Sequence, residues 1–170
     1  MKKYIALLML SLSSFVFADP AVFNLQLGKT SETQLKEQFK AKHSGINKYT
    51  SGNMYSIPVS QIQFDGLKEV TTIFNQEGIL IGVLTIFPKS KFDYLNNAIS
   101  QKYTLTSKNI PFVGNKTATY RDGSTEIKLD APHLSFEMSM NYLHDDLTRT
   151  FNQINEAERR KKEQAESSLL

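Results

Sequence analysis

Short stretches of alternating apolar and polar residues recur along the chain, and each of them predicts a β-strand. The alternation is strictest over residues 134–142, so we expect this strand to bury one face in the core and to expose the other to water. Residues 79–87 are apolar on both faces, so the second face needs a cover: the C-terminal helix, the other half of the chain, or a partner protein or lipid. Further strands are expected at residues 22–27, within 54–64, and at 69–74 and 126–129.

Two helices are predicted where pairs of apolar residues lie four positions apart behind a capping pattern. The first begins near Ser31, whose spacing to Gln34 matches a capping box, and it ends by about residue 42. The second begins near Ser90, with Ser90 and Asp93 as its capping pair. The apolar pairs are Leu35 with Phe39 and Leu95 with Ile99.

A third helix is predicted from Asp145, with apolar residues at positions 147, 151 and 154. Beyond residue 154 the apolar stripe ends, and residues 155–166 contain no large apolar side chain. Arg159 and Arg160 lie in this charged run. The run is either a solvated helix face or a contact for an acidic partner or for lipid head groups.

The second helix and the strands after it repeat the order of the first: Thr30 aligns with Ser90, and residues 66–70 align with residues 123–127. We therefore expect one α+β domain over residues 19–154, with an antiparallel sheet and helices packed on one of its faces. Its pseudo-repeat halves, each one helix and three strands, should span about 22–87 and 88–143. Residues 155–170 should form a charged, exposed C-terminal helix or tail.

The first eighteen residues have the pattern of a secretory signal peptide, with Lys2 and Lys3, a short apolar run, and small residues at Val16 and Ala18. The run is shorter than the roughly 20 residues that cross a bilayer as a helix. We expect cleavage after Ala18 and no retained membrane anchor. The expected location is the bacterial periplasm, with the extracellular medium as the alternative.

The composition excludes several classes of protein. The chain has no cysteine, which excludes disulfides, thiolate metal sites and a cysteine nucleophile. Two of its 20 Lys and Arg residues belong to the signal peptide, so the mature chain nearly balances its 17 Asp and Glu residues. This balance, together with the absence of Trp, argues against a nucleic-acid binder.

Candidate chemistry is sparse. His144 and Asp145 are adjacent, and together with Asp130 and His133 they could ligate a divalent metal if the hairpin between them brought them close. The alternative is that Asp145 or Asp146 caps the last helix, whose N-terminus favours negative charge. No nucleophile elbow, phosphate loop or dinucleotide fingerprint is present. A hydrolase with an unfamiliar site is therefore the lesser alternative, and we expect no cofactor.

Residues 27–39 run Leu-Gly-Lys-Thr-Ser-Glu-Thr-Gln-Leu-Lys-Glu-Gln-Phe. This segment resembles the G-x-[ST]-x-x-x-[VL] helix start of small exported α+β domains of the BamE/SmpA-like and β-lactamase-inhibitor-like group. The resemblance implies a binding role, because members of that group are outer-membrane assembly factors or proteinaceous inhibitors. The chain lacks the lipidation cysteine of the former and the disulfides of the latter, so the resemblance assigns no site residue.

The sequence thus favours an exported binding protein without catalytic activity, acting as a protein-partner or envelope-assembly module. The alternative is a carrier of a small molecule or lipid, with an apolar cavity between sheet and helix. An envelope protein or a lipid is the expected partner class. The candidate binding residues lie at the two expected hairpin tips, 75–78 and 130–133, and in the charged tail: Asn75, Gln76, Glu77, Asp130, His133, Arg159 and Arg160.

Overall fold

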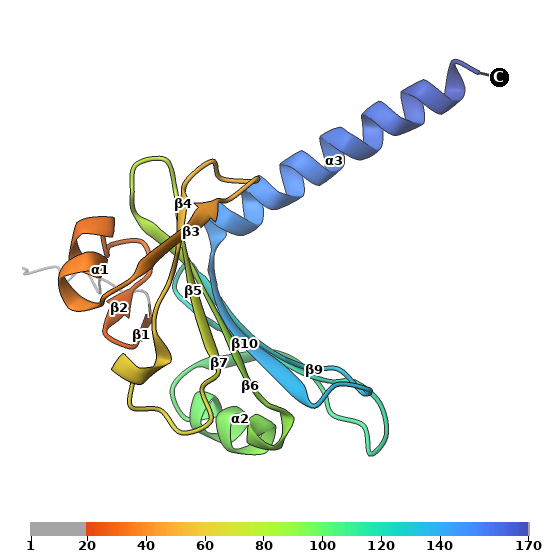
Figure 1. The fold of residues 1–170 in the computed structure, drawn as a ribbon. Helices are drawn as coiled ribbons and strands as arrows, with labels where there is room; N and C mark the ends of the chain where they lie inside the picture. The colour runs from red at the N-terminus through yellow and green to blue at the C-terminus, as the bar shows by residue number, and fades with distance from the viewer. Residues whose placement is uncertain (1–19, 170) are drawn as a thin grey trace, which may run out of the picture.

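The computed structural model describes residues 20–169 and contains one sheet of eight antiparallel strands, a small two-stranded hairpin and three α-helices (Figure 1). The α+β class and the antiparallel sheet predicted from the sequence are confirmed. The strands of the large sheet are β3 (Lys42–Ile46), β4 (Asn53–Ser56), β5 (Glu69–Phe74), β6 (Leu80–Pro88), β7 (Thr104–Asn109), β8 (Lys116–Asp122), β9 (Thr125–Ala131) and β10 (Glu137–His144). The remaining elements are β1 (Ala21–Val22), β2 (Leu25–Gln26), α1 (Glu32–Gln38), η1 (Val59–Gln61), η2 (Lys89–Lys91), α2 (Phe92–Ser100) and α3 (Asp145–Ser167).

The strand order across the large sheet is β3–β4–β5–β6–β10–β9–β8–β7. The first half of the chain supplies α1 and strands β3 to β6, the second supplies α2 and strands β7 to β10, and the halves join where β6 pairs with β10. Each half therefore contributes one helix and four strands of the large sheet, one strand more than the sequence suggested. The sequence marked neither β3 nor β7, the two edge strands, because their residues are mostly polar and exposed. It did not mark β8 either, although Ala118 and Tyr120 of that strand are buried.

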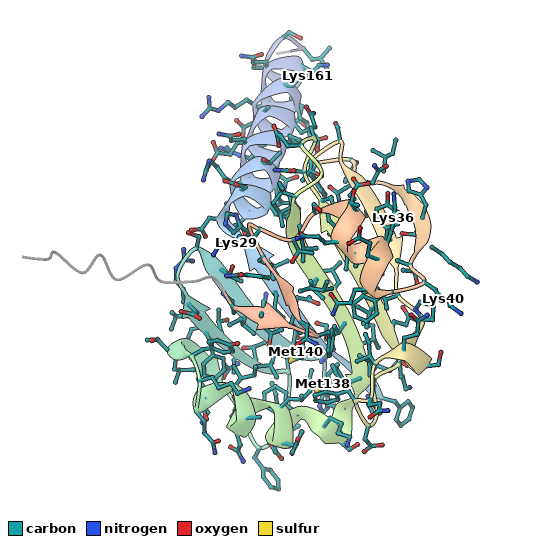
Figure 2. All side chains as sticks on the ribbon, turned by 90° about the vertical axis from the view of Figure 1, so that its left-hand side faces the viewer. Lys29, Lys36, Lys40, Met138, Met140 and Lys161 are labelled. Carbon is teal, nitrogen blue, oxygen red and sulfur yellow. The ribbon has the colours of Figure 1, made fainter. Side chains whose placement is uncertain are left out.

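The main core lies between the inner face of the sheet and the helices α1 and α2. Figure 2 looks onto this side of the molecule and labels Met138 and Met140, two buried core residues of β10. The apolar helix pairs expected from the sequence are all buried in this core, namely Leu35, Phe39, Leu95 and Ile99.

The predicted N-cap is confirmed for α1 and is wrong for α2. Ser31 caps α1 in a capping box: its Oγ accepts from the Gln34 N–H at 3.3 Å, and the Gln34 side chain accepts from the Ser31 N–H at 2.8 Å. The expected cap of α2 by Ser90 is wrong. The η2 turn leads directly into α2, so the N-cap position is Lys91, which already has helical backbone angles and makes no side-chain cap bond.

The helix α3 begins on the outer face of the sheet and then extends away from it (Figure 1). Leu147 is buried there against Ile81. Gly82 provides the space, because a Cβ at this position would come within 2.9 Å of Leu147 Cδ2. The first turns of α3 thus cover part of the second apolar face of β6, and Leu84 stays half-buried. Residues 156–169 are exposed, as expected for the charged tail.

The cap of α3 is His144 and neither of the two aspartates that the sequence suggested. The extended backbone of β10 runs through His144, whose ring Nδ1 accepts from the Asp146 N–H at 3.3 Å. Asp145 and Asp146 lie in the first turn, where the helix dipole still favours their negative charges.

Two sequence predictions concern membranes and export. The predicted signal peptide, residues 1–18, lies outside the described residues. Within residues 20–169, no helix has both the length and the apolar content of a membrane span.

Candidate functional site

Two loops lie next to each other at one end of the sheet. Residues 110–115 join β7 to β8, and residues 132–136 join β9 to β10. Because Lys116 pairs with Ala131 where the neighbouring strands β8 and β9 meet these loops, both loops project from the same end (Figure 1). The Asn115 side chain links them, since its Oδ1 accepts from the His133 N–H at 2.7 Å.

These loops carry four large apolar side chains that the core does not use: Phe112 is fully exposed, Leu134 and Phe136 are each 93 % exposed, and Val113 is 65 % exposed. We call these four residues the end patch. A fully exposed Phe presents on the order of 200 Å² of surface, so the two Phe side chains alone approach the largest apolar patches usual on soluble monomers. Exposure on this scale indicates an interaction surface.

The sequence placed Leu134 and Phe136 on the buried face of a strand, and this expectation is wrong. The strand β10 begins only at Glu137, so Leu134 and Phe136 both lie in the loop that precedes it. Lys89 fixes the loop by its backbone and by its side chain. Its N–H donates to the Phe136 carbonyl at 2.8 Å, and its Nζ donates to the carbonyls of Pro132 at 2.5 Å and His133 at 2.9 Å.

Two lysines near the end patch have carboxylate neighbours. Lys68 Nζ lies 2.7 Å from Glu137 Oε1, and Lys116 Nζ lies 3.9 Å from Asp93 Oδ1. The border of the apolar residues is therefore polar and carries both signs of charge, together with the Lys89 ammonium on the loop carbonyls. An apolar centre bordered by polar groups is the usual anatomy of a protein–protein interface.

The two predicted hairpin tips do not form one surface. The turn that contains Asn75, Gln76 and Glu77 precedes β6, whereas the turn that contains His133 precedes β10, which is antiparallel to β6. Asp130, expected in the same turn as His133, lies in β9 and is paired on both sides. The tips consequently lie at opposite ends of the sheet. Only the second tip adjoins the end patch, and the first helps to line a separate depression of about 330 Å³ beside the start of α3.

Arg159 and Arg160 belong to neither tip. Both lie on the exposed part of α3, where Arg159 Nη1 contacts Glu163 Oε1 at 2.8 Å and Arg160 Nη2 contacts Glu156 Oε2 at 3.5 Å. Figure 2 shows the neighbouring Lys161 far from the sheet. These pairs at i,i+4 spacing stabilise the helix itself, by a few tenths of a kcal/mol each.

The residues weighed as metal ligands are also separated. His133 precedes β10 and His144 ends it, so the whole strand lies between their side chains. Asp145 forms an ion pair with Arg121, and His144 caps α3. Within residues 20–169 the structure contains no group of three or more His, Asp or Glu side chains that could hold a metal ion.

A cluster of titratable side chains connects α1 to β4. Glu32 Oε2 accepts from the Tyr55 hydroxyl at 2.6 Å, Glu32 Oε1 accepts from Asn53 Nδ2 at 3.0 Å, and Lys36 lies 3.7 Å away. Burial by itself would raise the pKa of Glu32, but these hydrogen bonds and the charge of Lys36 outweigh it, so the pKa lies below its usual value. Both carboxylate oxygens are engaged, and we interpret the cluster as a link between helix and sheet.

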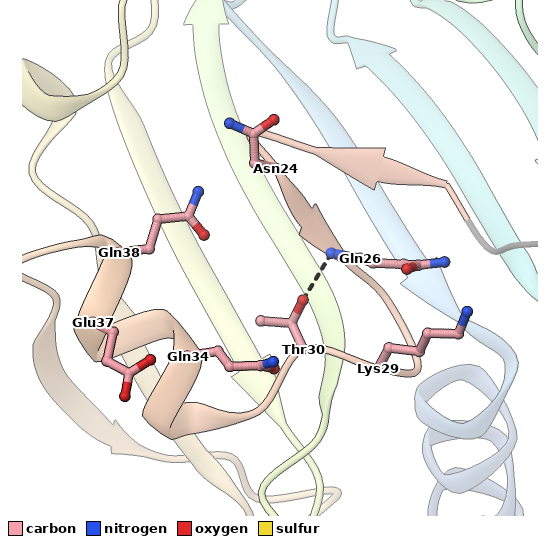
Figure 3. Close-up of a pocket in the computed structure, with 7 residues that line it drawn as sticks. All are labelled: Asn24, Gln26, Lys29, Thr30, Gln34, Glu37 and Gln38. Carbon is pink, nitrogen blue, oxygen red and sulfur yellow. Dashed lines mark hydrogen bonds between the residues drawn. The ribbon is translucent and has the colours of Figure 1, made fainter.

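A polar depression of about 610 Å³ lies on the other side of α1 (Figure 3). Its side chains spread around the rim without converging, with Glu37 and Lys29 on opposite sides, and Thr30 Oγ1 accepts from the Gln26 N–H at 2.8 Å. One carboxylate and one amine held apart provide no acid–base pair. The depression therefore presents no pair of groups suited to acid–base catalysis.

Comparison with protein-family models, with curated proteins and with solved structures finds no match to this chain. The geometry alone therefore identifies the candidate site. The sequence does not reveal this site, because Leu134 and Phe136 continue the alternation of the strand that follows them. The signal that could have found it is Pro132, which precedes them, together with the Pro111-Phe112-Val113-Gly114 loop, whose apolar residues follow no strand period.

Proposed function

We propose that this protein is a non-catalytic binding protein of the bacterial periplasm and that it binds a protein partner through the end patch. The observation that carries the proposal is the near-complete exposure of Phe112, Leu134 and Phe136 on adjacent loops. Export rests on the signal-peptide pattern of residues 1–18. The resemblance of residues 27–39 to the helix start of envelope assembly factors agrees with such a role.

The composition and the backbone of the patch suit an interface. Aromatic side chains are enriched in the centres of protein–protein interfaces and supply most of their binding energy. The loop bonds made by Lys89 and Asn115 hold Leu134 and Phe136 in place before a partner arrives. Less conformational entropy is lost on binding when the contact residues are already ordered.

The charges near the patch favour a protein over a lipid bilayer. A surface that binds anionic lipid usually presents unpaired Lys or Arg residues around its apolar side chains. Here Lys68 and Lys116 have the carboxylates of Glu137 and Asp93 as neighbours, and the Lys89 ammonium is engaged by the Pro132 and His133 carbonyls. The two carboxylates would also repel anionic head groups. A partner surface with its own apolar groove and a mixed polar rim fits this arrangement better.

Site-specific photocrosslinking in the periplasm tests the proposal. A benzophenone side chain at position Phe136 should yield a discrete protein adduct, and the same group at Ile46 is the matched control. Ile46 is 66 % exposed, but it lies on β3 at the edge of the sheet, away from the end patch. The adduct at Phe136 should disappear when Phe112 and Leu134 are both replaced by Ser.

Adducts of equal yield from Phe136 and Ile46 would indicate non-specific collisions and would contradict the proposal. So would an adduct that survives the two Ser substitutions, or the absence of any protein adduct at Phe136. Circular dichroism of the Ser variant should match the native protein, because neither side chain belongs to the core.

A further inference from the structure

A second feature, separate from the end patch, is a pocket of about 250 Å³ on the inner side of the sheet. Its walls are the β1–β2 hairpin, the helix α2 and the strand β10, and its lining is mostly apolar. Met140, which Figure 2 labels, lies in its wall together with Leu95 and Ala98 of α2. A pocket of this kind, apolar with few polar groups, is the usual form of a small-molecule site.

The hairpin wall has an unusual backbone. Phe23 and Asn24, at its turn, have φ angles of 54° and 62°, in the left-handed region. Asn tolerates this conformation, but a bulky aromatic residue adopts it only at an energetic cost. Packing holds Phe23 in place, since its ring meets the Phe64 ring edge-on at 6.3 Å, and both residues line the pocket. Strain of this kind is concentrated at functional sites.

One polar group is available to a ligand. Tyr142 lines the pocket and is only 4 % exposed, yet its hydroxyl makes no hydrogen bond to any residue of the described chain. No side-chain nitrogen or oxygen within residues 20–169 is both buried and unpartnered, so this hydroxyl must reach open space. The pocket is that space. Burial raises the pKa of Tyr142 well above its usual value, so the hydroxyl stays protonated and can both donate and accept.

The pocket offers no buried charge to a ligand. Lys102 is the one charged residue in its lining and is exposed, and the pKa of the half-buried Tyr103 is raised first by burial and then by the negative charge of Asp122. An uncharged head group at the buried Tyr142 hydroxyl would therefore be accepted with less desolvation than either a carboxylate or an amine.

We propose that this pocket binds a small uncharged amphiphile, with its apolar body between α2 and the hairpin and its hydroxyl or amide head bonded to the Tyr142 hydroxyl. The site is independent of the end patch, because the pocket opens on the inner side and the patch lies on the end loops.

Fluorescence titration of the mature protein tests this proposal. The chain has no Trp, so the emission of N-phenyl-1-naphthylamine can be followed without interference. The probe should brighten on binding, and octan-1-ol should displace it at least about tenfold more effectively than octanoate. Tyr142→Phe keeps the shape of the pocket and removes one hydrogen bond, so octan-1-ol should bind about two- to tenfold more weakly.

Two further variants locate the binding. Ala98→Phe fills the pocket and should abolish brightening. The variant with Phe112 and Phe136 both replaced by Ser should brighten like the native protein. Amide chemical shifts at Ala98 and Tyr142 should move with octan-1-ol, which keeps the test valid if Ala98→Phe fails to fold. Failure of this test leaves the end patch unaffected, because that site is tested by crosslinking at Phe136.

The proposal is wrong if the native protein gives no brightening or if Tyr142→Phe binds octan-1-ol as tightly as the native chain. It is also wrong if octanoate competes as well as octan-1-ol, because the pocket would then not discriminate between a charged and an uncharged head group. Loss of brightening in the end-patch variant would place the probe on the loops and would likewise overturn it.

Discussion

Val83 and Leu84 are adjacent residues of β6 that face opposite sides of the sheet, so the same substitution at each should have very different effects. Val83 is fully buried on the inner face, between Thr72 of β5 and Tyr142 of β10. Leu84 is half-buried on the outer face and pairs with Asn141. Residues 79–87 are apolar on both faces, so the sequence alone does not separate Val83 from Leu84. The structure places Val83 in the core, and Val83→Asp is therefore the substitution expected to unfold the domain.

The expected magnitudes follow from burial. Val83→Asp loses about 2 kcal/mol of apolar burial and adds several kcal/mol for a charge with no partner in the core. This total is comparable to the whole stability of a typical domain, roughly 5–15 kcal/mol. Leu84→Asp loses only about 1 kcal/mol, because its side chain is partly solvated, and Lys128 lines the same outer groove. For a domain of this size, that corresponds to a fall of about 3 °C in the melting temperature.

Thermal unfolding followed by far-ultraviolet circular dichroism distinguishes the two cases. Leu84→Asp should be soluble and melt cooperatively a few degrees below the native protein. Val83→Asp should be unfolded or insoluble at 25 °C. Cooperative melting of Val83→Asp at the same temperature as Leu84→Asp, or unfolding of Leu84→Asp alone, would refute the assignment of the two faces.

Three other predictions test separate parts of the structure. Removal of residues 155–170 should change the melting temperature by less than about 2 °C, because this part of α3 buries almost nothing; a larger fall would show that the tail packs on the domain. Tyr120→Phe should lower the free energy of unfolding by about 1–2 kcal/mol, since the buried Tyr120 hydroxyl donates to Asn96 Oδ1 at 2.6 Å; an unchanged value in urea titration would contradict this role. The pKa of Glu32 is lowered from its ordinary value of 4.5, so its stabilising effect is present above that pH and is lost as the pH falls through the folded-state pKa. Melting temperatures measured between pH 6 and about 3 should therefore fall more steeply for the native protein than for Glu32→Gln, and parallel curves would show that this carboxylate contributes no acid sensitivity.

The sequence by itself determined the parts of this fold that depend on near neighbours. The Ser31 capping box, the buried pair Leu35 and Phe39, and the hairpin around Gly78 all rest on interactions between residues a few positions apart. Such interactions leave a period or a short motif in the chain. The same holds for the exposed tail of α3, where the apolar stripe ends after residue 154 and the helix no longer packs on the sheet.

Only the tertiary structure decided which apolar residues stay exposed. Leu134 and Phe136 continue the alternation of β10, but the strand pairing begins at Glu137, so they lie on a loop beside the loop that carries Phe112. Tyr142 likewise reads as an ordinary core residue, and its unpartnered hydroxyl becomes visible only when the β1–β2 hairpin and α2 close around it. Alternation fixes which side of a strand a residue faces. Whether the residue is buried depends on which distant segments of the chain pack against that side. Such long-range contacts leave no local pattern in the sequence.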